Sequence, residues 1–235
     1  MAWVAGIDGC KAGWVCVLRN LETARTNFEI LTHVSAVSSL LEKPKIVAID
    51  VPIGLLDKAV RRGRQCDRLA REILRQPRAR SIFSPPVRQA LKSTTHPEAC
   101  DINSRSSPDQ IGISRQCFCL FPKIREVDDW IDANKQSVVY EIHPELSFAK
   151  MNGGSLQHSK KDKRGLTERR ALLFRNDFEA IVNAAEAHLL GVGKDDVYDA
   201  CAACWTAERI LRGDAEVIPT NPPRDRRKLR MEMRY

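Results

Sequence analysis

The chain has 235 residues, of which 43% are hydrophobic, so a single domain with a sizeable core is expected and wholesale disorder is not. No apolar run approaches the ~20 residues of a membrane span, and the start lacks the basic-then-apolar order of a signal peptide. A cytoplasmic protein without a membrane partner is therefore expected. The net charge of +8 is concentrated in residues 61–80 and 224–235, which suits a polyanion such as nucleic acid or a merely solubilising surface.

The N-terminal part has the pattern of a sheet. The sequence predicts strands at 3–8 and 14–19, joined by the glycine-containing turn GCKAG, and a third strand at 26–34. A short helix over SAVSSLLEK precedes a buried, β-branched strand at 45–50. The order is therefore three strands, a helix and a fourth strand.

The region of about 51–137 is too long for a simple connection, and we interpret it as a helical insertion and crossover. It contains an Arg-rich helix and a second predicted helix, FPKIREVDDWIDANK. A strand at 137–144 and a lysine-rich loop at 151–165 follow.

The C-terminal part is predicted to be mainly helical. The pattern predicts two helices, at about 166–175 and 177–190, and a short final strand at 215–219. Between them lies a helix at 194–213, with Asp195 expected at its N-cap and Gly213 at its end. The α/β domain would then span residues 1–218, and residues 219–235 would form a basic tail.

Carboxylates stand at the edges of several apolar elements. Asp8 ends the first strand and Asp50 the fourth, and parallel neighbouring strands bring their carboxyl ends to one edge of the sheet. Asp196 and Asp199 share a face in the first turn of the last long helix. The small residues after Asp199 suggest that this helix packs closely on the sheet, which would partly bury the carboxylate.

These carboxylates could hold a divalent cation. Like charges at such close range repel, and Mg²⁺ or Mn²⁺ prefers oxygen ligands. The predicted metal ligands are Asp8, Asp50, Glu141, Asp196 and Asp199. Each residue also has a structural alternative: Asp8 as a turn residue, Asp50 as a cap, and Glu141 as the partner of an Arg.

The cysteines suggest a second, weaker metal hypothesis. Cys201 and Cys204 form a C-x-x-C, but zinc needs four ligands in a closed set. Because both cysteines fall on one face of the predicted last helix, small core residues are the favoured interpretation.

Six segments of the chain together resemble a known family. The segments are GIDGCKAGW, AIDVPIGL, GRQCDRLARE, SIFSPP, YEIHPELSFAKMNG and DDVYDACAACWTAERI, in that order. They are similar to the family of domains of unknown function numbered four-two-nine, described as predicted ribonuclease H-like nucleases. The resemblance implies a ribonuclease H-like mixed sheet of about five strands flanked by helices, in which Asp8, Asp50 and Asp199 match the metal-binding places of the superfamily. The D-x-x-D-A of DDVYDA, similar to Holliday-junction-resolvase-like members, adds Asp196.

A metal-dependent nuclease is therefore the leading hypothesis. Two ions about 4 Å apart would hold the scissile phosphate, with Asp8 bridging them and Asp50 and Asp199 completing their coordination. Lys11, in the turn after Asp8, could steady a phosphate or simply be exposed. His143 could transfer a proton or be structural.

The Arg-rich helix supplies a possible nucleic-acid surface. Five arginines step by four and three residues along one helical face, either as phosphate donors or as a solvated surface. They are Arg64, Arg68, Arg71, Arg75 and Arg78.

Two other functions stay open, an actin- or sugar-kinase-like phosphotransferase and a non-catalytic nucleic-acid-binding protein of the same fold. The sequence also leaves open DNA or RNA, the oligomeric state, and whether Glu141 or Glu145 faces the site.

Overall fold

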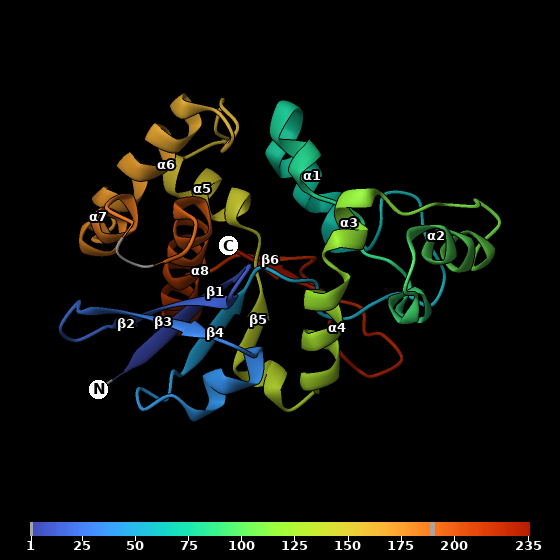
Figure 1. Cartoon of the computed structure of the whole chain (residues 1–235), viewed down its shortest axis with the longest axis horizontal. Coiled ribbons are helices and arrows are strands. Elements are labelled where there is room, and N and C mark those ends of the chain that lie inside the picture. The colour runs from blue at the N-terminus through green and yellow to red at the C-terminus, as the bar shows by residue number, and fades with distance from the viewer. Residues whose placement is uncertain (1, 189–190) are drawn as a thin grey trace.

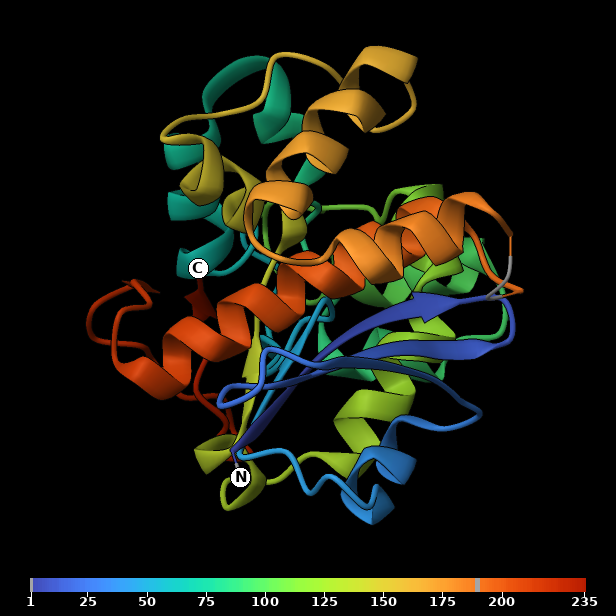
Figure 2. The same cartoon turned by 90° about the vertical axis from the view of Figure 1, so that its left-hand side faces the viewer.

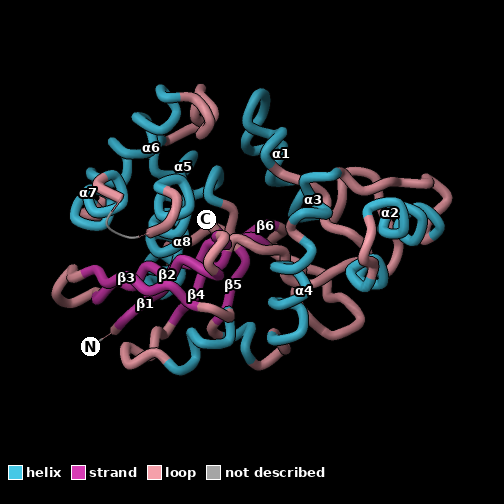
Figure 3. The backbone as a smooth tube through the Cα atoms, viewed as in Figure 1, coloured by secondary structure: helices cyan, strands magenta, loops and turns pink. Residues whose placement is uncertain are grey.

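The molecule is built on one mixed five-stranded sheet. The structure, a computed structural model, describes residues 2–188 and 191–235. The strand order is β3-β2-β1-β4-β5, and Figure 3 shows the strands in magenta. β2 is antiparallel to β1 and β3, whereas β4 is parallel to β1 and β5. The strands are β1 (Trp3–Cys10), β2 (Gly13–Asn20), β3 (Thr26–Leu31), β4 (Ile46–Ile49) and β5 (Val139–Glu141). The predicted α/β sheet is confirmed.

Alternate residues of each strand enter two different cores, as the two-residue period of a strand requires. Val4 and Ala48 face one core, and Ala5 and Ile49 face the other. The first core is covered by α5 (Pro144–Asn152), α6 (Lys163–Arg175), α7 (Glu179–Glu186) and α8 (Lys194–Arg212). The second is covered by α2 (His96–Arg105), α3 (Arg115–Cys119), α4 (Phe121–Trp130) and the 3-10 helices η1 (Val34–Ser39) and η3 (Arg88–Lys92). Figure 1 shows these layers on either side of the sheet.

The long segment between β4 and β5 is helical, as expected. It carries α1 (Gln65–Arg78), η2 (Ala79–Ser81), η3, α2, α3, α4 and η4 (Lys135–Ser137). α2 lies in a polar run for which the sequence predicted no helix; Thr95 caps it by accepting a hydrogen bond from Glu98 N at 3.4 Å. α1 is interrupted near its end, where Arg75 has φ 52°, so the predicted regular stripe of arginines is wrong there.

α8 lies directly against the middle of the sheet (Figure 2). Gly6 of β1 makes this close approach possible, because a Cβ atom there would lie 2.0 Å from Cys204 N and 2.2 Å from Ala200 O. The helix ends at Gly213 with φ 80°, as predicted, but its N-cap is Gly193 rather than Asp195. The predicted helix at 177–190 is α7, which ends at Glu186; residues 189–190 lie outside the described residues.

The C-terminal segment, expected to be a basic tail, packs into the domain. β7 (Met233–Arg234) pairs antiparallel with β6 (Val217–Ile218), and Arg234 forms a parallel bridge with Ile142 just beyond β5. Leu229 and Met231 are buried. Arg227 of this segment pairs with buried Asp128 at 3.3 Å, so part of the basic charge of the segment lies beside an internal acid. None of the described helices is long and apolar enough to cross a membrane.

Candidate functional site

Two aspartates emerge side by side from the centre of the sheet. Asp8 has the same parity as Val4 and Gly6, and Asp50 has the same parity as Ala48, so both carboxylates leave on the α8 side. The amide of Asp50 donates to Ile7 O at 3.1 Å, which fixes the two chain segments next to each other. The parallel pairing of β1 and β4 therefore places both acids at one sheet edge.

α8 brings two further carboxylates to this edge. Asp199 precedes Ala200, which contacts Gly6, and Asp199 itself is only 3% exposed. Its negative charge raises the pKa of both Asp8 and Asp50. Asp196 lies three residues earlier on the helix and also acts on Asp8. The close packing of the small residues of α8 on Gly6 thus determines where these acids lie.

The electrostatics of this carboxylate cluster, defined as Asp8, Asp50, Asp196 and Asp199, are unfavourable for four negative charges. Burial, and then the charges of Asp50 and Asp199, raise the pKa of Asp8 well above its ordinary value. Burial and the charge of Asp199 raise the pKa of Asp50 to about 7. Burial and the neighbouring Asp195 raise the pKa of Asp196 to about 6. The cluster therefore needs protons or a cation.

Lys160 supplies one positive charge to the cluster. Its Nζ lies 2.5 Å from Asp199 Oδ2, and the side chain is 38% exposed against 4% for Asp199. Burial lowers the pKa of Lys160, but the charges of Asp199, Asp8 and Asp50 outweigh it and the pKa is raised. Sequence reasoning missed this residue, because a lysine in a run of loop lysines carries no spacing signal.

His143 and Glu145 stand beside the cluster at the start of α5. His143 Nδ1 accepts a hydrogen bond from Glu145 N at 3.2 Å, and burial lowers the pKa of the histidine. Glu145 is 7% exposed; Arg169 pairs with its Oε1, whereas Oε2 has no hydrogen-bond partner among the described residues. The charge of Glu145 contributes to the raised pKa of Asp50, so Glu145 lies within electrostatic range of the cluster.

Glu141 lies on the other side of the sheet. It is paired in register with Ile49 and has the parity of Val139, both of which face the core on the insertion side. Its carboxylate accepts from Arg64 at 2.5 and 2.8 Å and from Ile53 N at 2.6 Å. Glu141 is therefore the ion-pair partner of Arg64, which is the structural alternative to a metal ligand that the sequence left open. Burial raises the pKa of Glu141 to about 7 although Arg64 opposes the shift.

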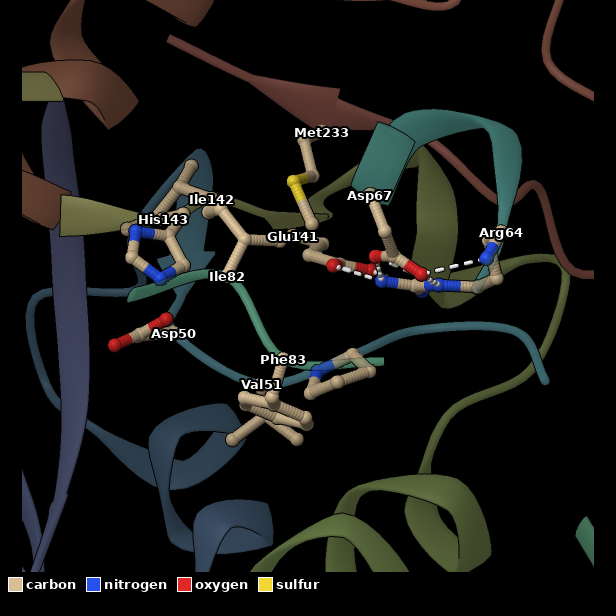
Figure 4. A pocket seen from close by; sticks show the side chains of 11 residues that line it. Asp50, Val51, Arg64, Asp67, Ile82, Phe83, Glu141, Ile142, His143 and Met233 are labelled. Carbon is tan, nitrogen blue, oxygen red and sulfur yellow. Dashed lines mark hydrogen bonds and ion pairs between the residues drawn. The ribbon is translucent and has the colours of Figure 1, made fainter. Parts of the chain in front are cut away.

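A small cavity of about 10 Å³, roughly the space that one water needs, lies between the two groups of charges. Figure 4 shows Asp50 and His143 toward one end and the network of Arg64, Asp67 and Glu141 at the other. Apolar side chains separate them: Val51, Pro52, Ile82, Phe83, Ile142 and Met233. The cavity therefore separates a charge-balancing network from the carboxylate cluster.

The five arginines predicted to bind nucleic acid are not equivalent. Arg64 is only 2% exposed, so its expected place on an outer face is corrected: it caps α1 and holds Asp67 and Glu141. Arg71 donates to Ile82 O at 3.0 and 3.1 Å, and Arg68 donates to Gly63 O at 2.9 Å. Arg78 is half-buried, and Arg75 is exposed beyond the interruption of the helix.

Two further sequence predictions have plain structural settings. Lys11 is exposed in the turn between β1 and β2. Cys201 and Cys204 are buried free thiols on the face of α8 that packs on the sheet. Burial raises the pKa of Cys201 well above its ordinary value, which suits the core interpretation rather than the zinc one.

The donor chemistry of the carboxylate cluster fits Mg²⁺ or Mn²⁺, since these ions prefer oxygen ligands. Across residues 2–188 and 191–235, however, no three Asp, Glu, His or Cys side chains converge closely enough to hold a metal ion. In this arrangement the ammonium of Lys160 provides the positive charge. Metal binding by Asp8, Asp50, Asp196 and Asp199 stays a prediction.

Comparison with known proteins identifies a family. A family model described as "Protein of unknown function (DUF429)" matches residues 6–224, and the chain belongs to that family. No curated protein matches the chain, and no solved structure does.

Proposed function

We propose that this member of the DUF429 family is a metal-dependent nuclease with a ribonuclease H-like fold. The observation that carries the proposal is the meeting of Asp8, Asp50 and Asp199 from two parallel strands and the helix packed across them. The charges of Asp50 and Asp199 raise the pKa of Asp8, and the charge of Asp199 raises the pKa of Asp50. Buried like charges are expensive to maintain, and their occurrence together is typical of functional sites.

The architecture supports the fold assignment. The five-stranded sheet, with β2 antiparallel to its neighbours and β4 parallel to β1 and β5, agrees with the mixed sheet of about five strands that the motif resemblance implies. The acids also stand where the resemblance places metal ligands, at β1, after β4 and in α8.

The roles follow from position. Asp8, Asp50 and Asp199, with Asp196, would hold Mg²⁺ or Mn²⁺, which when bound helps to activate water and stabilises the leaving oxygen. Glu145 adds negative charge beside Asp50. His143 accepts a hydrogen bond at Nδ1 from the amide of Glu145. Because Glu145 belongs to the first turn of α5, this hydrogen bond helps to hold the start of the helix in place.

Exposed basic residues follow Lys160 in the sequence and also stand near the end of α1, and they support a nucleic-acid substrate. Lys161, Lys163 and Arg164 are exposed just after Lys160. Arg75 and Arg80 are exposed near the end of α1, and Ser155 Oγ ties the lysine-rich loop to α1 by donating to Leu74 O at 2.6 Å. Phosphates held by such residues would approach a cluster that itself repels them unless a cation is bound.

The test is cleavage of labelled single-stranded DNA, RNA and branched DNA with Mn²⁺ or with EDTA. Cleavage that needs Mn²⁺ and disappears in Asp8→Asn supports the proposal. The matched control is Asp129→Asn, the same change at an exposed position on α4, which should cleave like the parent. ATP turnover instead of cleavage would indicate the phosphotransferase.

One observation favours a second candidate, a nucleic-acid-binding protein without catalysis. Lys160 already gives Asp199 a partner without any metal ion. Salt-sensitive binding of all three nucleic acids, with no cleavage and no Mn²⁺ binding, would identify this function.

A further inference from the structure

The lysine-rich loop between α5 and α6 is held at several points. Ser155 Oγ donates to Leu74 O at 2.6 Å, and Leu156 is 4% exposed. Arg169 Nη1 donates to His158 O at 3.2 Å, and Asp162 caps α6 by accepting from Arg164 N at 3.0 Å. The backbone on both sides of Lys160 is therefore fixed, and its side chain is brought to the cluster from an anchored position.

The contact of Lys160 is specific to one acid. Its Nζ lies 2.5 Å from Asp199 Oδ2, a charge-assisted hydrogen bond to a side chain that is 4% exposed. The same charge acts on Asp8, Asp50 and Asp196. The next residue, Lys161, is exposed. The ammonium of Lys160 thus stands among the acids that the proposed function assigns to a metal ion.

The arrangement explains two facts together. The acids are close enough to perturb one another, yet no three of the described acidic, histidine or cysteine side chains are arranged around a metal position. A lysine ammonium and a divalent cation meet the same need, because each supplies positive charge to the same oxygens. Both cannot contact Asp199 Oδ2 in the same direction at once.

We propose that Lys160 is a built-in cation that occupies the carboxylate cluster in the metal-free protein, and that Mg²⁺ or Mn²⁺ binds by displacing its ammonium from Asp199. This inference rests on the proposed function, since it takes the cluster to be the metal site. Lys160 of the lysine-rich loop would then compete with the metal ion for Asp199, and this competition would set the metal concentration at which the site fills.

The direct test measures Mn²⁺ binding by calorimetry in the parent, in Lys160→Met and in Lys161→Met. Methionine keeps a similar length and removes the charge. Lys160→Met should bind Mn²⁺ roughly tenfold more tightly or better, the scale of one charge-assisted hydrogen bond. Lys161→Met should match the parent. Metal-free Lys160→Met should also unfold at lower urea than Lys161→Met, and added Mn²⁺ should remove this difference.

A second measurement needs no variant. Lys160 in the metal-free parent should react slowly with an acylating reagent and should react faster once Mn²⁺ is added, as followed by peptide mass spectrometry. Lys161 is the internal control and should react at the same rate with and without Mn²⁺. Unchanged protection of Lys160 in the Mn²⁺-loaded protein would overturn the displacement.

The outcomes separate this inference from the proposed function. If the parent binds Mn²⁺ and Lys160→Met binds equally or less tightly, the inference fails while the metal site stands. If neither protein binds Mn²⁺, both fail. If only Lys160→Met binds Mn²⁺, the lysine occupies the cluster but metal does not displace it, so both the displacement and the metal-dependent function of the parent fail.

Discussion

Replacing Gly6 by alanine tests how closely the core and the carboxylate cluster are coupled. The added Cβ would lie 2.0 Å from Cys204 N and 2.2 Å from Ala200 O, and both contacts are with the backbone of α8. Ordinary contact begins at about 3.4 Å. No side-chain rotation relieves the clash, so either α8 or β1 must move.

The size of the effect follows from that shortfall. α8 must withdraw by about 1.4 Å, the difference between 3.4 and 2.0 Å. Overpacking with flexible side chains costs about 1–3 kcal/mol, and rigid backbone on both sides places this variant at or above about 3 kcal/mol. For a chain of this size, that lowers Tm by roughly 6–12 °C. The withdrawal also carries Asp199 away from Asp8, so Mn²⁺ binding should weaken in the folded variant.

Thermal unfolding followed by circular dichroism measures the loss of stability, and calorimetry measures Mn²⁺ binding. The control is Gly154→Ala, where the added Cβ meets nothing within 4 Å, and its Tm should stay close to that of the parent. A Gly6→Ala protein that melts with the parent would refute the reasoning, because α8 could then not lie where the structure places it.

Three further predictions concern charge. The pKa of Asp50 is raised to about 7 from about 3.9 in an unfolded chain. Between these pH values the native state binds a proton at Asp50 that the unfolded chain has lost. The stabilisation that this proton gives the metal-free protein therefore falls as pH rises from about 4 to 7. Asp50→Asn removes this fall, so urea denaturation in EDTA should show its advantage over the parent growing with pH and levelling above about 7; parallel curves would contradict the shift. Glu141→Gln leaves Arg64 without its full buried partner and should cost about 3–5 kcal/mol in urea denaturation, while Mn²⁺ affinity of the folded protein stays unchanged; weaker Mn²⁺ binding would return Glu141 to the metal ligands. Arg75→Gln and Arg80→Gln, both at exposed positions, should each lower the salt slope of nucleic-acid binding by about one unit at unchanged Tm, and an unchanged slope would remove them from the interface.

Local sequence signals were sufficient for the sheet and for the placement of three acids. Short apolar runs predicted the strands, and the expected parallel pairing of the first and fourth strands predicted that Asp8 and Asp50 emerge at one edge of the sheet. The small residues after Asp199 indicated close packing of α8, and Gly6 is the sheet residue against which they pack. These features depend on neighbours within a few residues, so they are visible in one sequence.

Other parts of the site depend on contacts that no local pattern contains. The face on which Glu141 lies is set by its register with Ile49 in another strand. Arg64 is buried with an ion-pair partner, Glu141, that lies 77 residues away in the sequence. A helical projection includes only the neighbours of Arg64 along α1, so it cannot predict this contact. Lys160 reaches Asp199 through a loop whose path is fixed by α1 and α6. Loop paths and strand registers are tertiary properties, and sequence periodicity does not determine them.

The packing of the last residues beside β5 also has a consequence for self-association. An uncovered strand edge offers unpaired amides and carbonyls to other chains and is a common starting point for aggregation. The bridge between Arg234 and Ile142 continues the pairing just beyond the end of β5, and buried Leu229, Met231 and Met233 cover apolar surface next to it. Removing residues 225–235 would therefore expose an apolar strand edge to which other chains can pair. The shortened protein should aggregate, although none of the residues of the carboxylate cluster is removed.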